Sequence, residues 1–172
     1  GQTDIAVLDG GLPKWQAEGR ETEDLPPVIR DRHMTVRRQN QMVKDVTQVS
    51  AAAKLQDTEI LDARAPARFR GEVPEPRPGL RAGHIPGSKN VPYATLLNDD
   101  GTLKAPEALR AVFEAAGVDL GKPAITSCGS GVTAAILNLA LTRIGKDDHS
   151  LYDGSWSEWG QFPTLPVATG EH

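Results

Sequence analysis

Cys128 is the only cysteine in the 172-residue chain, and it begins the glycine-rich stretch Cys128-Gly129-Ser130-Gly131-Val132-Thr133. An apolar segment at 123–127 precedes it, and apolar residues at helical spacing follow it. We therefore expect the thiol where a buried strand passes into a helix, at the sheet edge where open α/β folds bind ligands. A single cysteine forms no internal disulfide and no multi-cysteine metal cluster, so the question is whether this thiol is reactive.

The glycine-rich stretch has the composition needed to hold this thiol as a thiolate. A free thiol has a pKa of about 8.5, so ionising it at neutral pH requires a shift of about two units, or about 2.7 kcal/mol. A helix dipole contributes about 0.3–1 kcal/mol, and at most about 2. The remainder must come from loop amides and from hydroxyls such as those of Ser130 and Thr133. The alternative is that Cys128 is a small buried hydrophobic residue, the commoner role of a free cysteine.

A cysteine before such a loop also suggests a cysteine phosphatase. Those enzymes place an arginine at the end of the loop, where it holds the phosphate. Here the corresponding stretch, Val132-Thr133-Ala134-Ala135, contains no arginine, and no other cation lies in the loop. The sequence therefore disfavours phosphoryl transfer, because the developing charge would lack its clamp.

Predicted strands and helices alternate around this loop. We expect helices at 46–55, 105–116 and 131–144, and strands at 59–63, 123–127 and 149–152, with a brief strand at most in 84–93. This alternation indicates the α/β class, with a mainly parallel central sheet flanked by helices. The stretch 66–83 is dense in proline and glycine and is predicted to be a long irregular loop, a kind that is often functional.

The beginning of the chain repeats a piece of its end. Residues 5–8 are apolar and are predicted to form a buried strand leading into a turn. At one common offset, Asp9, Gly10 and Trp15 match Asp153, Gly154 and Trp159. Coincidence in a glycine-rich sequence is one explanation; we favour an internal repeat. On that interpretation 1–27 is the tail of a preceding domain, 28–41 is a linker rich in charge, and 42–172 is the catalytic domain.

Composition narrows the classes of function. Hydrophobic residues make up 38% and charged residues 24%, enough for one core. The net charge of −4 argues against a nucleic-acid binder, and no apolar run approaches the roughly 18 residues that a membrane helix needs. No signal peptide opens the sequence, and the lone thiol fits a reducing compartment, so we expect a cytoplasmic location.

Several motifs taken together resemble the rhodanese superfamily and, within it, the 3-mercaptopyruvate sulfurtransferases. The stretch from Cys128 to Thr133 is similar to their active loop. Thiosulfate-preferring relatives usually carry charged residues after the cysteine, where this chain has Gly129 and Ser130. The other matching stretches are Leu61-Asp62-Ala63-Arg64, Arg68-Phe69-Arg70-Gly71, Pro74-Glu75-Pro76-Arg77, Gly83-His84-Ile85-Pro86-Gly87-Ser88 and Asp153-Gly154-Ser155-Trp156-Ser157-Glu158-Trp159.

The resemblance implies a rhodanese-like fold and a two-domain protein, with the active cysteine in the second domain and a missing N-terminal rhodanese-like domain as its partner. It implies that Cys128 takes sulfur from 3-mercaptopyruvate as a persulfide, releases pyruvate, and passes the sulfur to cyanide or to a thiol acceptor such as thioredoxin. Ser130 would assist proton transfer or polarise the substrate. Neither a cofactor nor a metal is expected.

The resemblance also assigns the substrate-binding residues. Arg68 and Arg77 would hold the carboxylate and carbonyl of the substrate, since a guanidinium pairs bidentately with a carboxylate. The alternative for both is an ordinary solvated surface arginine. The loop residues Gly129, Gly131, Val132 and Thr133 complete the binding site.

Two other residues in the matching stretches are expected to be structural. We expect Arg64 to pair with a neighbouring carboxylate and His84 to support the fold. Two alternative functions remain: a thiosulfate:cyanide sulfurtransferase that uses the same persulfide, and an inactive rhodanese-like binding module.

Overall fold

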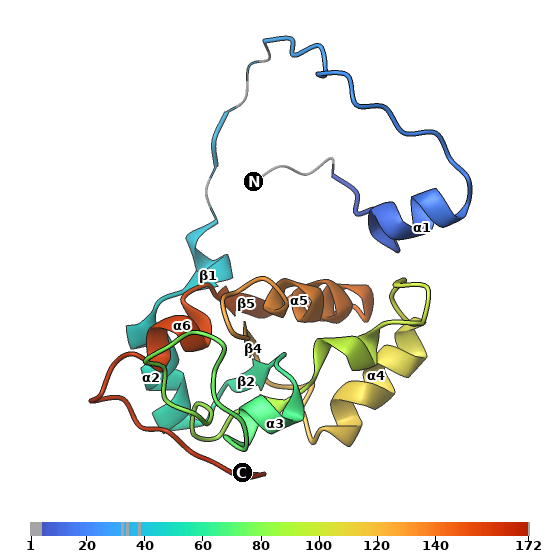
Figure 1. Cartoon of the computed structure of the whole chain (residues 1–172). Coiled ribbons are helices and arrows are strands. Elements are labelled where there is room, and N and C mark those ends of the chain that lie inside the picture. The colour runs from blue at the N-terminus through green and yellow to red at the C-terminus, as the bar shows by residue number, and fades with distance from the viewer. Residues whose placement is uncertain (1–4, 32, 34, 38, 172) are drawn as a thin grey trace.

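The computed structural model describes residues 5–31, 33, 35–37 and 39–171, and these form one α/β domain preceded by an extended segment (Figure 1). The strands are β1 (Val43–Lys44), β2 (Glu59–Asp62), β3 (Lys89–Asn90), β4 (Ala124–Ser127) and β5 (His149–Tyr152). The helices are α1 (Gly11–Ala17), α2 (Val46–Leu55), α3 (Pro66–Phe69), α4 (Pro106–Ala115), α5 (Ala134–Arg143) and α6 (Ser155–Trp159), with 3₁₀ turns η1 (Asn40–Met42) and η2 (Tyr93–Leu96).

The described strands form a five-stranded sheet in the order β1-β5-β4-β2-β3, and every neighbouring pair is parallel. β2 and β4 are buried along their whole length, as expected for central parallel strands with both faces covered. The prediction of an α/β fold with a mainly parallel sheet is confirmed.

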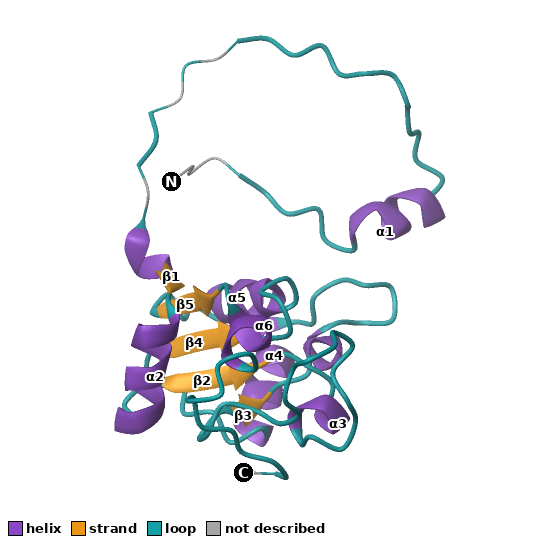
Figure 2. Cartoon of the chain, turned by 60° about the vertical axis from the view of Figure 1, so that its left-hand side comes forward, coloured by secondary structure: helices purple, strands orange, loops and turns teal. Residues whose placement is uncertain are grey.

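Helices cover both faces of the sheet, with α4 and α5 on one face and α2 and α6 on the other (Figure 2). The pleat of the strands sends alternate side chains to opposite faces. Leu61 of β2 therefore packs with α4 and α5, whereas its neighbour Ile60 packs with α2 and α6. Two compact hydrophobic clusters result, and both lie against the strands that carry the site.

Short sequence signals set the ends of the helices. The Asp45 side chain accepts the backbone N–H of Gln48, and the Gln48 side chain in turn accepts the N–H of Asp45, a capping box that starts α2. Pro106 occupies the first turn of α4, where its missing N–H costs nothing. The predicted helices 46–55 and 105–116 are thereby confirmed.

The third predicted helix begins later than expected. Its first regular residue is Ala134 instead of Gly131, because Gly131 has a φ of 84° and cannot belong to a right-handed helix. Residues 129–133 instead form a turn between β4 and α5. This difference matters for function, since the residues withdrawn from the helix are those that surround the thiol.

The prediction of a buried strand at 5–8 is wrong. Residues 5–8 are exposed and lie outside any strand, with Ile5 76% exposed and Val7 68% exposed. The apolar run has the composition of a strand, but among the described residues no strand lies beside it to share hydrogen bonds. The α1 helix follows this run.

The extended N-terminal segment touches the domain at one described place. The Asp9 carboxylate accepts the Leu103 N–H at 2.9 Å, and Lys14 lies 3.2 Å from Asp100. In Figure 1, α1 accordingly lies beside the loop that joins η2 to α4. The described residues between 20 and 39 are all exposed and outside helices and strands. Within the described chain, no helix combines the length and apolar character needed to cross a bilayer.

Leu137 tests how far the α5 packing supports the domain. This side chain is fully buried in the cluster that also contains Cys128. We expect Leu137→Ala to lower the free energy of unfolding by about 2–5 kcal/mol, because the cavity it leaves cannot fully collapse. Urea denaturation measures the loss. The matched control is Leu55→Ala, at a 70% exposed position, which should change it by less than about 0.5 kcal/mol; equal effects would contradict the packing described here.

Candidate active site around Cys128

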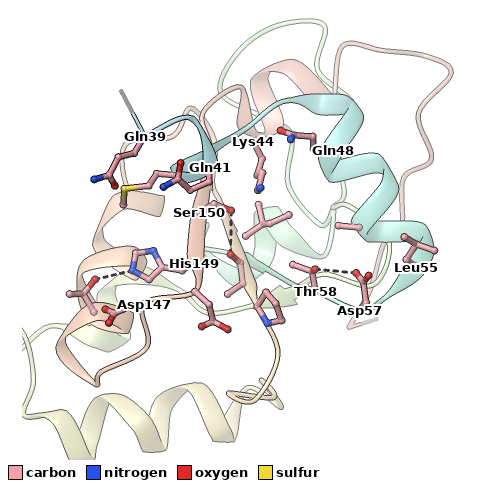
Figure 3. A pocket seen from close by; sticks show the side chains of 17 residues that line it. Gln39, Gln41, Lys44, Gln48, Leu55, Asp57, Thr58, Asp147, His149 and Ser150 are labelled. Carbon is pink, nitrogen blue, oxygen red and sulfur yellow. Dashed lines mark hydrogen bonds between the residues drawn. The ribbon is translucent and has the colours of Figure 1, made fainter. Parts of the chain in front are cut away.

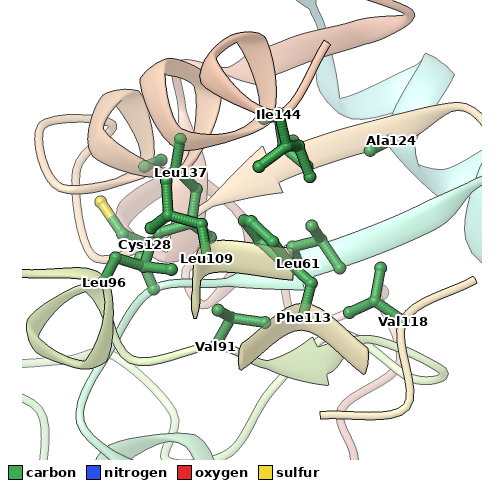
Figure 4. Close-up of a cluster of buried hydrophobic side chains, with 14 residues drawn as sticks. Leu61, Val91, Leu96, Leu109, Phe113, Val118, Ala124, Cys128, Leu137 and Ile144 are labelled. Atoms are coloured by element: carbon green, nitrogen blue, oxygen red, sulfur yellow. The ribbon is translucent and has the colours of Figure 1, made fainter. Parts of the chain in front are cut away.

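Cys128 directly follows β4 at the carboxyl edge of the sheet, beside the end of β5. Its residue is only 2% exposed. Figure 4 shows the residue at the margin of the hydrophobic cluster, with the sulfur atom turned away from the neighbouring apolar side chains. The thiol is therefore buried without being surrounded by hydrocarbon, and its polar neighbours come from the loop that follows.

Hydrogen bonds lower the pKa of this thiol despite its burial. Burial by itself raises the pKa of Cys128, because it penalises the charged thiolate. Hydrogen bonds from the Thr133 hydroxyl and from the backbone N–H groups of Ser130, Ala134 and Thr133 together outweigh burial and hold the pKa below its ordinary value. These donors are all uncharged. They include loop amides and the Thr133 hydroxyl, as predicted, whereas Ser130 contributes its backbone N–H and not its hydroxyl.

The first turn of α6 holds the backbone at Cys128. The hydroxyl of Ser155 accepts the Cys128 N–H at 3.1 Å and donates to the Tyr152 carbonyl at 2.8 Å. The Trp156 N–H donates to the Cys128 carbonyl at 3.0 Å. Ser155 adopts a φ of 50°, an unusual value for a residue other than glycine, which supports the idea of a constrained functional turn.

A cavity of about 200 Å³ opens beside the loop. It brings together both predicted substrate-binding arginines, Arg68 and Arg77, with the predicted loop residues Gly129 and Ser130. Glu75, Pro76, Leu80 and Ser157 complete the lining. A Cβ atom placed on Gly129 would lie 3.1 Å from the Arg68 guanidinium, so glycine here lets the arginine approach the loop closely.

Buried carboxylates fix one side of this cavity. Glu75 pairs with both Arg64, at 2.9 Å, and Arg68, at 2.5 Å, and its side chain is only 1% exposed. Arg64 also pairs with Asp62 at 2.7 Å and lies over the Trp156 ring. The expectation that Arg64 pairs with a neighbouring carboxylate is confirmed. Arg68 keeps 29% of its side chain exposed, so one face of its guanidinium remains open toward the cavity.

The other loop residues predicted for the site are placed differently from one another. Thr133 is half-buried and supplies the hydroxyl donor to the thiol, whereas Val132 is 74% exposed and lies outside the lining of the cavity. Gly131 packs so closely on Asp153 that a Cβ atom would lie 3.0 Å from its oxygens. His84 is fully buried, stacks on Phe69 and bonds the Phe69 carbonyl through Nδ1, which confirms its structural role.

Three further residues lie at the site without having been predicted as part of it: Glu75, Ser155 and Ser157. The position of the two serines in the sequence could have predicted them. They lie three and five residues after the end of β5, and adjacent parallel strands bring their carboxyl ends to one edge of the sheet. Nothing in the sequence marks Glu75 as buried. Among the described residues, no three His, Cys, Asp or Glu side chains are grouped as metal ligands.

A second, larger cavity of about 720 Å³ lies at the opposite edge of the sheet, where β4 and β5 begin (Figure 3). It is lined by residues that include Gln41, Lys44 and His149. Burial lowers the pKa of His149, whose Nε2 contacts the Thr142 hydroxyl at 2.8 Å. This cavity contains no nucleophilic cysteine and is separated from the thiol by the length of the strands.

Residues 45–162 match the rhodanese-like domain family, and this range contains Cys128 and every residue that lines the cavity beside its loop. The chain belongs to the rhodanese family. The chain is 44% identical over 163 residues to the 3-mercaptopyruvate sulfurtransferase of Escherichia coli, covering 95% of this chain and 58% of that protein. It is 40% identical over 160 residues to the thiosulfate sulfurtransferase of Bos taurus, covering 92% of this chain and 54% of that protein.

The fold agrees with a solved rhodanese structure. The crystal structure of SseA from Escherichia coli, a 3-mercaptopyruvate sulfotransferase, superposes with a TM-score of 0.78 and 40% identity over 91% of this chain and 58% of that one. The rhodanese chain described here thus spans a little more than half the length of the relatives that it matches. Similarity is shared with relatives named for two different sulfur donors.

Thr133 provides a test of the donors that stabilise the thiolate. Thr133→Val keeps the shape of the side chain but removes its hydroxyl, so the thiolate is less stabilised and the pKa of Cys128 rises. The rate of alkylation by iodoacetamide, measured against pH, should therefore reach half its maximum at higher pH than in the unmodified chain. Thr164→Val, at an exposed position outside the site, is the control. An unchanged midpoint in Thr133→Val would exclude the hydroxyl as a donor.

Glu75 provides a test of the buried charge network. Glu75→Gln leaves the buried Arg64 with one fewer carboxylate partner and frees Arg68, so we expect a loss of about 3–5 kcal/mol in unfolding free energy. Glu72→Gln removes an exposed partner of Arg70 and should cost less than about 1 kcal/mol. Chemical denaturation of both variants makes the comparison. A loss at Glu75 no larger than that at Glu72 would show that the network contributes no stability.

Proposed function

We propose that this chain carries the catalytic site of a sulfurtransferase that moves sulfur from 3-mercaptopyruvate to a thiol acceptor through a persulfide on Cys128. The observation that carries the proposal is a buried thiol with a lowered pKa, stabilised by uncharged donors, next to a cavity with two arginines. Uncharged donors can stabilise a thiolate and a persulfide anion alike, since neither requires a fixed cation. The names of the relatives support the same chemistry.

The transfer proceeds by attack of the Cys128 thiolate on the sulfur of 3-mercaptopyruvate. A new S–S bond forms as the C–S bond breaks, and the electron pair of that bond passes to carbon as the enolate of pyruvate. The enolate takes up a proton to become pyruvate, and the terminal sulfur loses one to become the persulfide anion. Ser130 lines the cavity and is exposed, so its hydroxyl is available to move a proton or to polarise the substrate.

The charge balance of the cavity favours a donor with one carboxylate. Asp62 and Glu75 compensate Arg64 and Arg68. Arg77, in the same cavity, has no carboxylate within ion-pair distance among the described residues, so the cluster carries a net charge of about +1. A bidentate guanidinium suits the single carboxylate of 3-mercaptopyruvate. Thiosulfate, which carries two negative charges, is the alternative donor and is suggested by the thiosulfate-named relative.

The outer sulfur of the persulfide is then transferred to an acceptor. The acceptor thiolate attacks the outer sulfur, a new S–S bond forms, and the Cys128 thiolate leaves, which restores the enzyme. Cyanide accepts the sulfur in the same way, and a small thiol or a protein thiol such as that of thioredoxin fits the chemistry. Such thiol chemistry favours a reducing compartment, and we propose the cytoplasm. The net charge of −4 gives no support for nucleic acid as a partner.

We also propose that the N-terminal segment is the end of a preceding rhodanese-like domain, followed by the linker. In both copies of the repeat, a short helix follows a turn and its first residue has a positive φ, at Gly11 (60°) and Ser155 (50°). In both, the tryptophan that follows donates its indole N–H to a downstream carbonyl, from Trp15 to Glu21 and from Trp159 to Pro166. These two shared features support the repeat, although the aligned glycines Gly10 and Gly154 differ, with φ of 84° and −58°.

The mass of the protein after incubation with 3-mercaptopyruvate tests the function. We expect a gain of one sulfur atom, removable by reductant, with release of pyruvate. Cys128→Ser should gain nothing, because no thiolate remains to attack the donor. The same measurement with thiosulfate compares the two donors. Faster sulfur loading from thiosulfate would contradict 3-mercaptopyruvate as the preferred donor and favour thiosulfate.

The alternative that the chain is an inactive binding module is tested by labelling the same protein with iodoacetamide. Iodoacetamide should label Cys128 faster near neutral pH than it labels a free thiol of ordinary pKa. A thiol that is labelled no faster, together with no gain of sulfur from either donor, would contradict a sulfurtransferase and favour the binding module.

A further inference from the structure

The first turn of α6 contacts the backbone of Gly129 as well as that of Cys128. Ser157 contacts the Gly129 carbonyl twice, since its backbone N–H donates at 3.0 Å and its hydroxyl donates as well. A carbonyl has two lone pairs, so these two donors satisfy it completely. The Gly129 carbonyl is therefore held toward α6.

Holding this carbonyl also orients the next amide. The Gly129 carbonyl and the Ser130 N–H belong to one planar, trans peptide unit, in which the two groups point in opposite directions. The carbonyl points at Ser157, so the Ser130 N–H is turned away from α6. That N–H is one of the donors to the Cys128 sulfur. The orientation of the Ser130 N–H thus depends on the contact between Ser157 and the Gly129 carbonyl, which is at the other side of the same peptide unit.

The same hydroxyl contacts the substrate-binding side of the cavity. Arg77 donates from Nη1 to the Ser157 hydroxyl, which in turn donates to the Gly129 carbonyl. The hydroxyl accepts from one partner and donates to the other, so the three groups form a continuous chain of hydrogen bonds, and each bond polarises the next. Arg77, Ser157 and Gly129 all line the one cavity.

We propose that Ser157 is a positioning residue that aims the Ser130 N–H at the Cys128 sulfur and, through the same hydroxyl, places Arg77 to receive the substrate carboxylate. The first half depends on geometry alone. The second half rests on the function proposed above, because it assumes a donor with a carboxylate. Ser157 does not touch the reacting atoms; it couples the group that binds the substrate to the loop that stabilises the nucleophile.

Changing Ser157 removes none of the charged groups around the loop. They are Arg68, Glu75 and Arg77 from the segment after β2, and Asp153 from the turn after β5. A variant at Ser157 that alters the thiol therefore reports on the hydroxyl and on the peptide it holds, since no ionised side chain is removed.

The alkylation of Cys128 against pH tests the first half without any sulfur donor. In Ser157→Ala the Ser130 N–H is less firmly aimed, so the midpoint of iodoacetamide labelling should move to higher pH. Ser157→Thr keeps a hydroxyl and should restore the midpoint. Ser50→Ala, in α2 and away from the loop, is the matched control. A midpoint in Ser157→Ala equal to that of the control would overturn the proposal.

Steady-state kinetics with 3-mercaptopyruvate test the coupling to Arg77. Ser157→Ala should raise KM about 3- to 10-fold, the range for losing one hydrogen bond. Arg77→Gln should raise KM about 10- to 100-fold, because it also removes the charge that pairs with the substrate carboxylate. The double variant should show about the same KM as Arg77→Gln alone, because both changes break one chain. Effects on KM that multiply would show that the two residues act independently and would overturn the coupling.

The outcomes separate this inference from the proposed function. A shifted labelling midpoint in Ser157→Ala, with no gain of sulfur in the unmodified chain, supports the positioning role and contradicts the sulfurtransferase. Normal sulfur loading with an unchanged midpoint and unchanged KM in Ser157→Ala supports the sulfurtransferase and contradicts the positioning role. Thermal unfolding of each variant identifies loss of fold; if Ser157→Ala unfolds, Ser157→Gly, which also removes the hydroxyl and keeps the backbone N–H, takes its place under the same midpoint and KM criteria.

Discussion

The site depends on lowering the pKa of a buried thiol without placing a cation against it. Burial opposes the thiolate, so several uncharged donors must converge on the sulfur to offset that cost. They are loop amides and the Thr133 hydroxyl, and Gly131, whose φ of 84° is incompatible with a right-handed helix, keeps residues 129–133 in a turn before α5. The loop in turn keeps its shape because the first turn of α6 binds the backbone of Cys128 and Gly129. Cys128 is thus held by the segments that follow two adjacent strands, β4 and β5.

The arginines depend on a second buried arrangement. Glu75, enclosed between Arg64 and Arg68, allows two guanidinium groups to lie close together beside the cavity, where their repulsion would otherwise separate them. Asp62 at the end of β2 anchors Arg64 from the other side. The irregular stretch after β2 is consequently held by buried ion pairs, although it contains little regular structure. Charge balance inside this network leaves Arg77 as the cavity arginine without a carboxylate partner among the described residues.

Much of the fold was predictable because the signals for it are local. The capping box at Asp45 and the proline at Pro106 mark helix starts within a few residues, and the apolar runs at β2 and β4 have the composition of buried parallel strands. The apolar run at 5–8 shows the limit of this reasoning. A strand exists only where a neighbour supplies hydrogen bonds, and composition alone does not reveal whether that neighbour is present.

The sequence by itself determined the fold class and the family to which the chain belongs, because both are carried by short motifs and local periodicity. It also predicts Cys128 as the nucleophile, and the resemblance to the family predicts Arg68 and Arg77 as substrate-binding residues. Only the tertiary structure decided which neutral groups face the sulfur, that Glu75 is shared by two arginines, and that Ser157 joins Arg77 to the loop. The two Ser157 contacts join residues 28 and 80 positions apart, through the parallel packing of β4 and β5 and the folding of the segment after β2 against them. Glu75 lies only 7 and 11 positions from its two arginines, but the segment that carries all three has no regular spacing that would pair them. Spacing along the chain carries no record of such distances, so the chemistry of the residues could be predicted and their partners could not.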